Sequence, residues 1–140
     1  MTNPAVIFWP VLLQILLTLS MYVLLLQRKK RAFNEGRVDE ARRALHEDAW
    51  PDEVVQVNNN IRNQFHLPVL FYVICIMLWA LQHVYVFTVI LAWMFVFSRI
   101  VHAWVHVGSN YVPLRRRMFT FGVVMLFGLM VGVIASLLGI

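Results

Sequence analysis

The sequence has little charge and a single cysteine. Charged residues make up 14% of the 140 residues, and Cys75 alone cannot form a disulfide scaffold. Hydrophobic residues make up 61%, whereas a soluble domain has roughly 45–50%. A body this small cannot bury so much apolar surface, because surface grows relative to volume as a chain shortens. The composition therefore excludes intrinsic disorder and a soluble domain, and it indicates a protein largely surrounded by lipid.

Acidic residues are absent outside one short stretch. All seven lie within residues 35–53, and eight of the twelve Lys and Arg residues lie within 28–62. The other basic residues are Arg99 and the run 115–117. Because these basic residues sit beside apolar segments and have no stacking aromatics in a polar setting, we expect a membrane protein and no nucleic-acid partner.

Four apolar segments are long enough to cross a bilayer, for which a helix needs about 20 residues. We expect spans at about 5–27, 59–81, 84–107 and 114–138, with a cytoplasmic loop at 28–58. The sequence thus predicts a single all-α domain, 1–140, built as an integral membrane four-helix bundle. Within the loop we expect one short helix from Val38 to Glu47, supported by an Asp39–Arg43 pair at i,i+4.

The distribution of Lys and Arg predicts the orientation. The loops after the first and third spans carry these residues, whereas residues 1–4, the Gln82–His83 turn and the C-terminal tip carry none. Lys and Arg accumulate in cytoplasmic loops. We therefore expect both termini outside the cytoplasm, in a multi-pass protein whose short form suggests a bacterial inner membrane.

Polar side chains form two stripes, each on one face of a predicted helix. The second span carries Asn59, Arg62, Asn63 and His66, and the third carries Arg99, His102 and His106. Both stripes fall near the cytoplasmic ends of their spans, where Arg115 opens the fourth. Ionisable groups within a span usually face the bundle interior or a wet cavity. With cations, amides and no internal acid, such a site favours a carboxylate-bearing ligand or an ionised thiol.

Some of these residues have simpler explanations. Arg62 and the run 115–117 could anchor at lipid headgroups. Three histidines, His66, His102 and His106, could instead hold a metal or haem, but the spans contain no carboxylate and we assign no metal ligand. Pro68 is expected to kink the second helix.

Three stretches are similar to motifs of a known family. Residues 30–33 (KRAF) match the basic end of its first helix, and residues 63–68 (NQFHLP) resemble its Asn-x-x-Glu followed by proline. Arg99, His102, Gly108 and Arg115 follow a third-helix signature. The chain therefore resembles the MAPEG family, the membrane-associated proteins in eicosanoid and glutathione metabolism. Its third helix is nearest to the prostaglandin E synthase branch.

The resemblance implies a homotrimer that binds glutathione, as co-substrate, at each subunit interface near the cytoplasm. Family contact positions correspond to Lys30 or Arg31, Asn63, Arg99, His102 and Arg115. Arg115 corresponds to the arginine credited with activating the thiol. The remaining stripe residues complete the expected ligand site: Asn59, Arg62, His66 and His106.

Three positions depart from the family pattern. His66 replaces the glutamate that holds the ammonium of glutathione, Asn59 replaces an arginine, and His106 replaces a tyrosine. Losing one charge-assisted hydrogen bond costs roughly 1.5–3 kcal/mol. The leading hypothesis is a glutathione-dependent transferase or peroxidase that acts on lipophilic electrophiles dissolved in membrane lipid. The alternative is a non-catalytic member of the same fold that binds a lipid or a partner protein.

Overall fold

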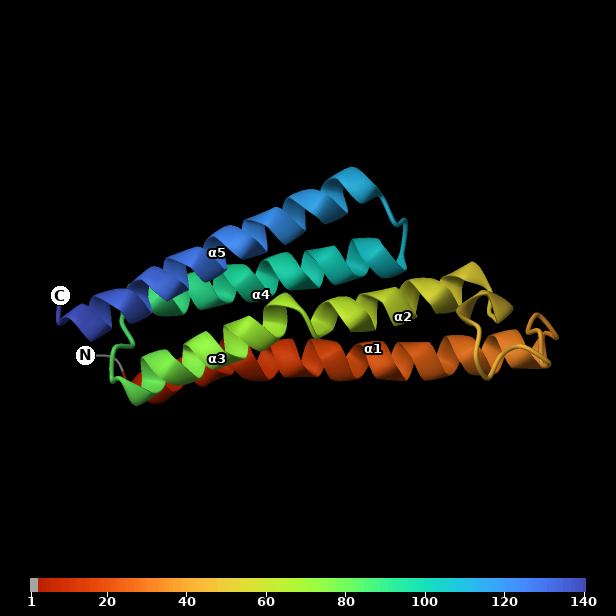
Figure 1. Cartoon of the computed structure of the whole chain (residues 1–140), viewed down its shortest axis with the longest axis horizontal. Coiled ribbons are helices and arrows are strands. Elements are labelled where there is room, and N and C mark those ends of the chain that lie inside the picture. Colours follow the sequence, from red (N-terminus) through yellow and green to blue (C-terminus); the bar gives the residue numbers. More distant parts are fainter. Residues whose placement is uncertain (1–2) are drawn as a thin grey trace.

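The computed structural model describes residues 3–140, all of whose long elements are helices. A 3-10 turn, η1 (Pro4–Ile7), precedes α1, and a second, η2 (Glu47–Ala49), precedes α2. The helices are α1 (Phe8–Asn34), α2 (Asp52–Gln64), α3 (Leu67–Ala80), α4 (Val86–Val107) and α5 (Val112–Leu138). Figure 1 shows them lying side by side along one long axis.

The helices form four segments long and apolar enough to cross a membrane. These are Pro4–Asn34, Asp52–Ala80, Val86–Val107 and Val112–Leu138, the second of which comprises α2 and α3. Apolar side chains exposed along the bundle, such as Leu26, Phe87 and Leu137, suit contact with lipid. The predicted all-α, four-helix membrane bundle is confirmed.

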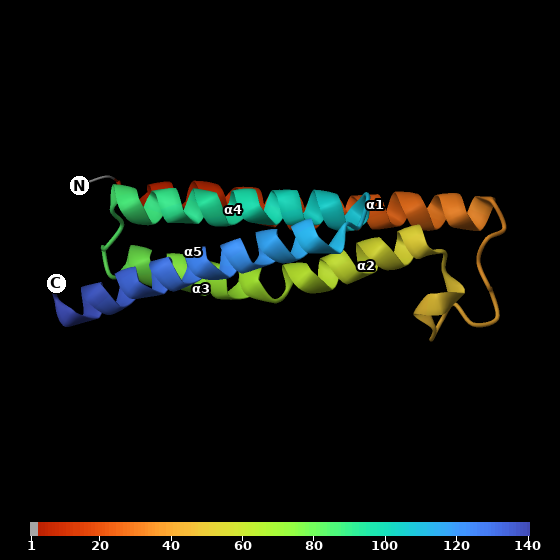
Figure 2. The same ribbon diagram turned by 90° about the horizontal axis from the view of Figure 1, so that it is seen from above.

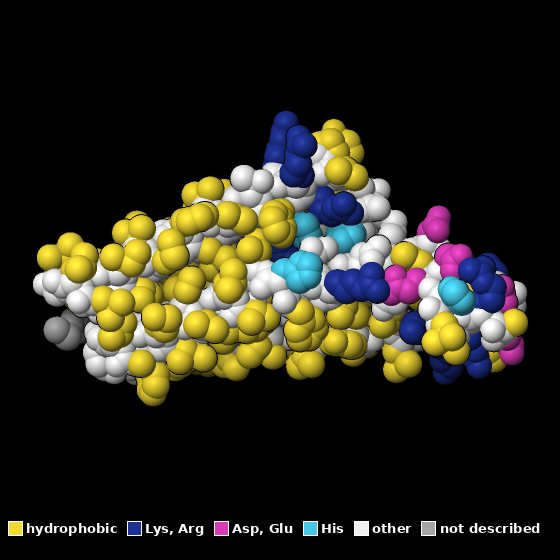
Figure 3. Space-filling model, in the orientation of Figure 1, with side chains coloured by type: hydrophobic (Ala, Val, Ile, Leu, Met, Phe, Trp, Pro, Cys, Tyr) yellow, Lys and Arg dark blue, Asp and Glu magenta, His cyan; other side chains and the backbone are white. Residues whose placement is uncertain are grey.

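The described ends of the chain lie at one end of the bundle, and the loops after α1 and α4 lie toward the other (Figures 1 and 2). α1 and α2 continue beyond the end of α4, so the 35–51 loop lies farther out than the short connection from α4 to α5. Figure 3 shows hydrophobic side chains covering the end with the termini, while Lys, Arg, His and acidic side chains gather toward the opposite end.

The apolar core lies mainly between α3, α4 and α5 and also includes Ile7 of η1 and Val11 of α1. Phe71 of α3 stacks on Phe95 of α4, with ring centroids 4.4 Å apart, and buried Cys75, Leu78 and Leu129 pack in the same cluster. α4 and α5 approach closely at Gly122, where an added Cβ would lie 2.9 Å from Ser98 Oγ. This close pairing fixes the position of the charged first turn of α5 relative to α4.

The second span departs from a single kinked helix. α2 ends at Gln64 and α3 begins at Leu67, with Phe65 and His66 between them. Pro68 lies in the first turn of α3. Proline has no backbone N–H, and the N–H groups of a first turn have no intrahelical partner, so the proline is accommodated there. The chain therefore breaks before Pro68 and does not form one helix kinked at it. α2 also begins at Asp52, earlier than the predicted span, and its acidic first turn belongs to the helix and not to the loop.

The predicted helix from Val38 to Glu47 is wrong. Residues 40–45 form turns, and the expected Asp39–Arg43 pair is replaced by an Arg42 contact with Asp39 at 4.0 Å. Nearly every side chain in this segment is exposed, so no apolar face packs against the bundle to stabilise an isolated short helix. Arg42 instead binds Asp48, at 2.8 Å to Oδ2, which closes the segment into a compact loop.

Candidate functional site

Arg99 is the largest fully buried side chain of the protein's described part and lies on α4, 0% exposed. Its Nη2 donates to the carbonyl oxygen of Asn63 at 3.4 Å, and its guanidinium lies over the ring of Phe119 at 5.8 Å. Nε and Nη1 are buried with no hydrogen-bond partner among residues 3–140. A buried cation is costly unless it is paired. The two free donors therefore point to an anion that residues 3–140 of one chain do not supply.

His102 lies one turn along the same face of α4 and contacts α5. Its Nδ1 is 3.0 Å from the carbonyl oxygen of Arg115. A carbonyl only accepts hydrogen bonds, so Nδ1 carries the proton. Nε2 of His102 is buried and has no partner in the described chain. In the neutral imidazole this nitrogen is an acceptor, which adds an unpaired group beside the unpaired donors of Arg99.

Two polar pockets meet at Arg115, in the first turns of α5. One encloses about 250 Å³ and the other about 310 Å³. The first is lined by Asp52, Val55, Gln56, Asn59, His106, Asn110 and Arg115. The second is lined by Asn63, His102, Val112, Arg115, Arg116 and Phe119. A ligand that spans both would meet cations, amides and imidazoles from α2, α4 and α5.

The loop between α4 and α5 holds the Arg115 side chain. Arg115 Nη1 donates to the side-chain oxygen of Asn110, which takes up a left-handed backbone conformation at φ 53°. Asparagine tolerates this conformation better than most residues. The turn residues 108–113 thus help to direct the half-buried guanidinium toward the shared edge of the two pockets.

The site contains one acid that the sequence analysis left in the loop. Because α2 begins at Asp52, that carboxylate lines the first pocket together with Asn59 and Arg115. The expectation of a site without any internal acid is therefore wrong. A ligand in this pocket can meet an acceptor for an ammonium group as well as donors for its carboxylates.

A chain of buried amides, which was not predicted from the sequence, reaches the site from α1. Gln14 Nε2 donates to Gln64 Oε1 at 2.8 Å, and Gln64 Nε2 donates to Asn60 Oδ1 at 3.1 Å. Asn60 Nδ2 then lies 3.4 Å from Nδ1 of His106. The i,i+4 spacing of Asn60 and Gln64 was the available signal, on a face of α2 adjacent to the expected stripe.

Not all predicted residues gather at these pockets. Asn59, Asn63, His102, His106 and Arg115 line them, and Arg99 is tied to Asn63. Arg62 is exposed and pairs with Glu47 in the loop. The exposed His66 lies in the break between α2 and α3.

The basic end of α1 lies at a different pocket. Lys30 and Arg31 line an open pocket of about 390 Å³, together with Gln27, Asn34 and Glu35. Arg31 Nε pairs with Glu35 at 3.1 Å. Within one chain, these two basic residues and the Arg115 pockets are therefore separate sites.

The described residues do not support the alternative of a metal ion held by three histidines. Within residues 3–140, no three His, Cys, Asp or Glu side chains lie close enough together to hold a metal ion. His102 and His106 are neighbours, with ring centroids 5.6 Å apart, whereas His66 is exposed in the break between α2 and α3.

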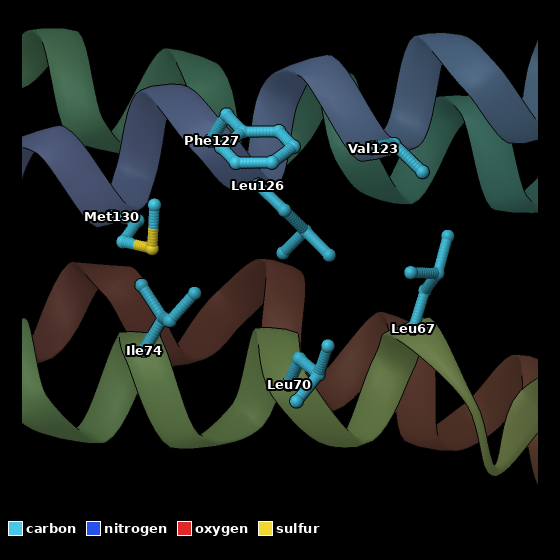
Figure 4. A pocket seen from close by; sticks show the side chains of 7 residues that line it. All are labelled: Leu67, Leu70, Ile74, Val123, Leu126, Phe127 and Met130. Carbon is cyan, nitrogen blue, oxygen red and sulfur yellow. The ribbon is translucent and has the colours of Figure 1, made fainter.

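An apolar pocket lies beside the polar site, between α3 and α5. It encloses about 140 Å³ (Figure 4). Its lining is Leu67, Leu70 and Ile74 of α3 with Val123, Leu126, Phe127 and Met130 of α5. With no polar group in its lining, it suits a hydrocarbon chain or another apolar surface.

Comparison with known proteins gives one match. The model of the MAPEG family matches residues 6–135, which is nearly the whole chain and includes every residue of both polar pockets. Neither a curated protein nor a solved structure matches the chain.

Proposed function

Since the chain belongs to the MAPEG family, we propose that it is a glutathione-dependent transferase or peroxidase acting on lipophilic electrophiles. The observation that carries the proposal is the burial of Arg99 with two donor nitrogens unpaired among the described residues. Glutathione has two carboxylates and a thiol, so it can supply the missing anion. Asn63, His102 and His106, at the pocket walls, would position the tripeptide.

In this proposal Arg115 stabilises the thiolate. A guanidinium near sulfur favours the ionised form, and the thiolate is the reactive nucleophile. With a halogenated electrophile, a carbon–sulfur bond forms, the carbon–halogen bond breaks, halide leaves with the electron pair, and the thiol proton goes to solvent. With a lipid hydroperoxide, two glutathione molecules are oxidised to the disulfide while the hydroperoxide is reduced to an alcohol and water.

Three further features belong to the proposal. The loops after α1 and α4 face the cytoplasm, because the Lys and Arg residues outside the helical interior gather at that end. The protein is a homotrimer, in which the basic end of α1 from one copy can complete the Arg115 pockets of its neighbour. Lys30 and Arg31 would then join a site from which they are separate within one chain. The bacterial inner membrane remains the proposed location.

The lipophilic substrate would approach from the bilayer. The apolar pocket between α3 and α5 opens next to Leu67, which follows directly on the α2–α3 break beside the polar site. An acyl chain in this pocket would bring a reactive group toward the first turns of α5. Burying a hydrocarbon in so apolar a lining is favourable at roughly 25 cal/mol per Å².

The test is conjugation of glutathione to a chlorodinitrobenzene by detergent-purified protein, with reduction of an organic hydroperoxide as the second assay. We expect Arg115→Ala to lower kcat/KM by roughly 10–100-fold, the equivalent of one charge-assisted hydrogen bond. Arg117→Ala is the matched control, because Arg117 is exposed on the same turn and lines neither polar pocket. Unchanged turnover in Arg115→Ala would contradict the assigned mechanism.

The second candidate is a non-catalytic member that binds a lipid or a partner protein. Two observations favour it: His66 and His106 replace residues of the family pattern, and the α3–α5 pocket is entirely apolar. Absence of turnover at millimolar glutathione in both assays would favour this candidate over the first.

A further inference from the structure

The buried amide chain gives His106 a defined chemical role. We propose that Gln14, Gln64 and Asn60 are positioning residues that hold His106 as the Nε2–H tautomer, so that it presents a hydrogen-bond donor to the pocket beside Arg115. The three amides come from α1 and α2, and the histidine comes from α4. None of the three amide residues lines either of the two polar pockets.

The direction of the chain follows from its hydrogen bonds. All three amides donate from their NH₂ groups toward His106, and Gln64 and Asn60 each accept on the side-chain oxygen from the amide before them. A ring nitrogen that accepts from Asn60 Nδ2 cannot carry a proton. The proton of a neutral His106 is therefore on Nε2, the nitrogen left for the pocket that His106 lines.

Burial makes this direction hard to change. Gln14 and Asn60 are 0% exposed and Gln64 is 1% exposed, so water does not compete for their hydrogen bonds. An unpaired amide in such a place costs roughly 1–3 kcal/mol. The chain already leaves Gln14 Oε1 unpaired at its far end, and reversing all three amides would leave an unpaired NH₂ group there instead. Under-satisfied oxygens are tolerated better than unpaired N–H groups in protein interiors, so the observed direction is the favoured one.

The neighbouring histidine has the opposite tautomer. His102 donates from Nδ1 to the Arg115 carbonyl and has its lone pair on the unpaired Nε2. The two rings are in edge-to-face contact, with centroids 5.6 Å apart. One ring therefore offers a donor and the other an acceptor on the two sides of Arg115, which suits a ligand that carries both an anionic group and an N–H or S–H group.

The charged groups around His106 agree with a donor at this position. Arg115, from α5, and Asp52, from α2, line the same pocket, and Arg99 lies two turns earlier on α4. An anion attracted by the arginines would accept a hydrogen bond from Nε2–H. The role of this donor in ligand binding rests on the proposed function, whereas the tautomer itself does not.

The test is ¹⁵N NMR of the full-length protein labelled at histidine, without ligand and at a pH where His106 is neutral, with its signals assigned by their loss in His106→Gln. We expect the wild-type spectrum to show Nε2 protonated and Nδ1 unprotonated at His106, and the reverse at His102. In Asn60→Leu we expect the His106 signals to shift toward a mixture of tautomers. Val57→Ala is the control, because it removes buried volume from the same helix without touching the amides.

The outcomes separate this inference from the proposed function. A proton on Nδ1 of His106 in the wild type would overturn the inference whether or not Asn60→Leu folds, and so would unchanged signals in a folded Asn60→Leu. Gln14→Leu, at the far end of the chain, is the second variant and should shift the His106 signals in the same direction but less. If the tautomers are as expected, glutathione should bind roughly tenfold more weakly to Asn60→Leu than to Val57→Ala. Equal affinities would overturn the donor role, and no binding to any form would contradict the proposed function as well.

Discussion

His102 and Arg115 are joined by a hydrogen bond from the ring Nδ1 to the backbone carbonyl oxygen, 3.0 Å long. The contact fixes the first turn of α5 against α4 without using the Arg115 side chain. Arg115→Ala therefore leaves this link in place. A loss of activity in that variant would report on the guanidinium and not on the position of the helix.

Removing the buried cation should stabilise the empty protein. We expect Arg99→Leu to raise the thermal unfolding midpoint of the ligand-free protein or leave it unchanged, because an unpaired buried charge is replaced by apolar volume. The same variant should lose the rise in midpoint that glutathione gives the wild type. Differential scanning of both proteins with and without glutathione measures these effects. A large fall in the ligand-free midpoint would mean that Arg99 has a partner within the protein.

Arg28 joins three helices and should matter for stability more than its neighbours. Its Nη1 donates to the carbonyl oxygen of Glu53 at 2.7 Å, and its Nη2 donates to that of Val107 at 2.8 Å. Arg28→Ala loses both bonds and leaves the carbonyl of Val107, at the C-terminal end of α4, without this donor. We expect a loss of roughly 2–4 kcal/mol, measured by unfolding in a denaturing detergent. Arg37→Ala is the control and should lower the free energy of unfolding by less than Arg28→Ala does, because the ion pairs of Arg37 with Glu35 and Glu53 are exposed to solvent.

The loop between α1 and α2 should respond to acid in a defined direction. Hydrogen bonds from Arg42 lower the pKa of Asp48 below its ordinary value of 3.8. The ion pair therefore contributes its full stabilisation above that ordinary value and loses it as the pH falls through the lower pKa of the folded loop. Carboxyl ¹³C NMR should place the Asp48 titration below pH 3.8 in the wild type. In Arg42→Gln the titration should return toward 3.8, and an unchanged titration there would contradict the assignment of the shift to Arg42.

The orientation can be tested with single cysteines. Cys75 is fully buried, so the native thiol should stay unlabelled by a membrane-impermeant maleimide. Added to intact cells, the reagent should label Gln82→Cys in the α3–α4 turn. It should label Ala41→Cys in the long loop only after the membrane is opened. The reverse pattern would place the polar pockets on the outer side of the membrane.

The sequence predicted the features that depend on long patterns. Four apolar segments, each long enough to cross a bilayer, predicted the helical membrane bundle. A signal spread over about 20 residues does not depend on the identity of any single residue. The burial of Arg99 followed from its depth in the third span. Helical spacing likewise identified Asn59, Asn63, His102 and His106 as residues that line the polar pockets.

The remainder depends on contacts that no local pattern specifies. Asn60 was missed because it lies beside the predicted stripe and not on it, and because its partner Gln64 is bonded by Gln14, which is distant in sequence. Asp52 was assigned to the loop because a charged residue does not look like the start of a membrane span. The structure begins α2 at Asp52, and the buried side chains of Val54 and Val57 support this first part of the helix. The absent helix at 38–47 shows the converse, since local charge pairing without an apolar face was not enough to form it.

The most direct test of the account is a calorimetric titration of glutathione into the purified protein, repeated with Arg99→Leu and with the control Arg117→Ala. The account predicts saturable binding to the wild type and the control, and an affinity at least tenfold lower in Arg99→Leu. Equal affinities in all three proteins, or no heat of binding at millimolar glutathione in the wild type, would contradict the claim that buried Arg99 binds an anionic group of glutathione.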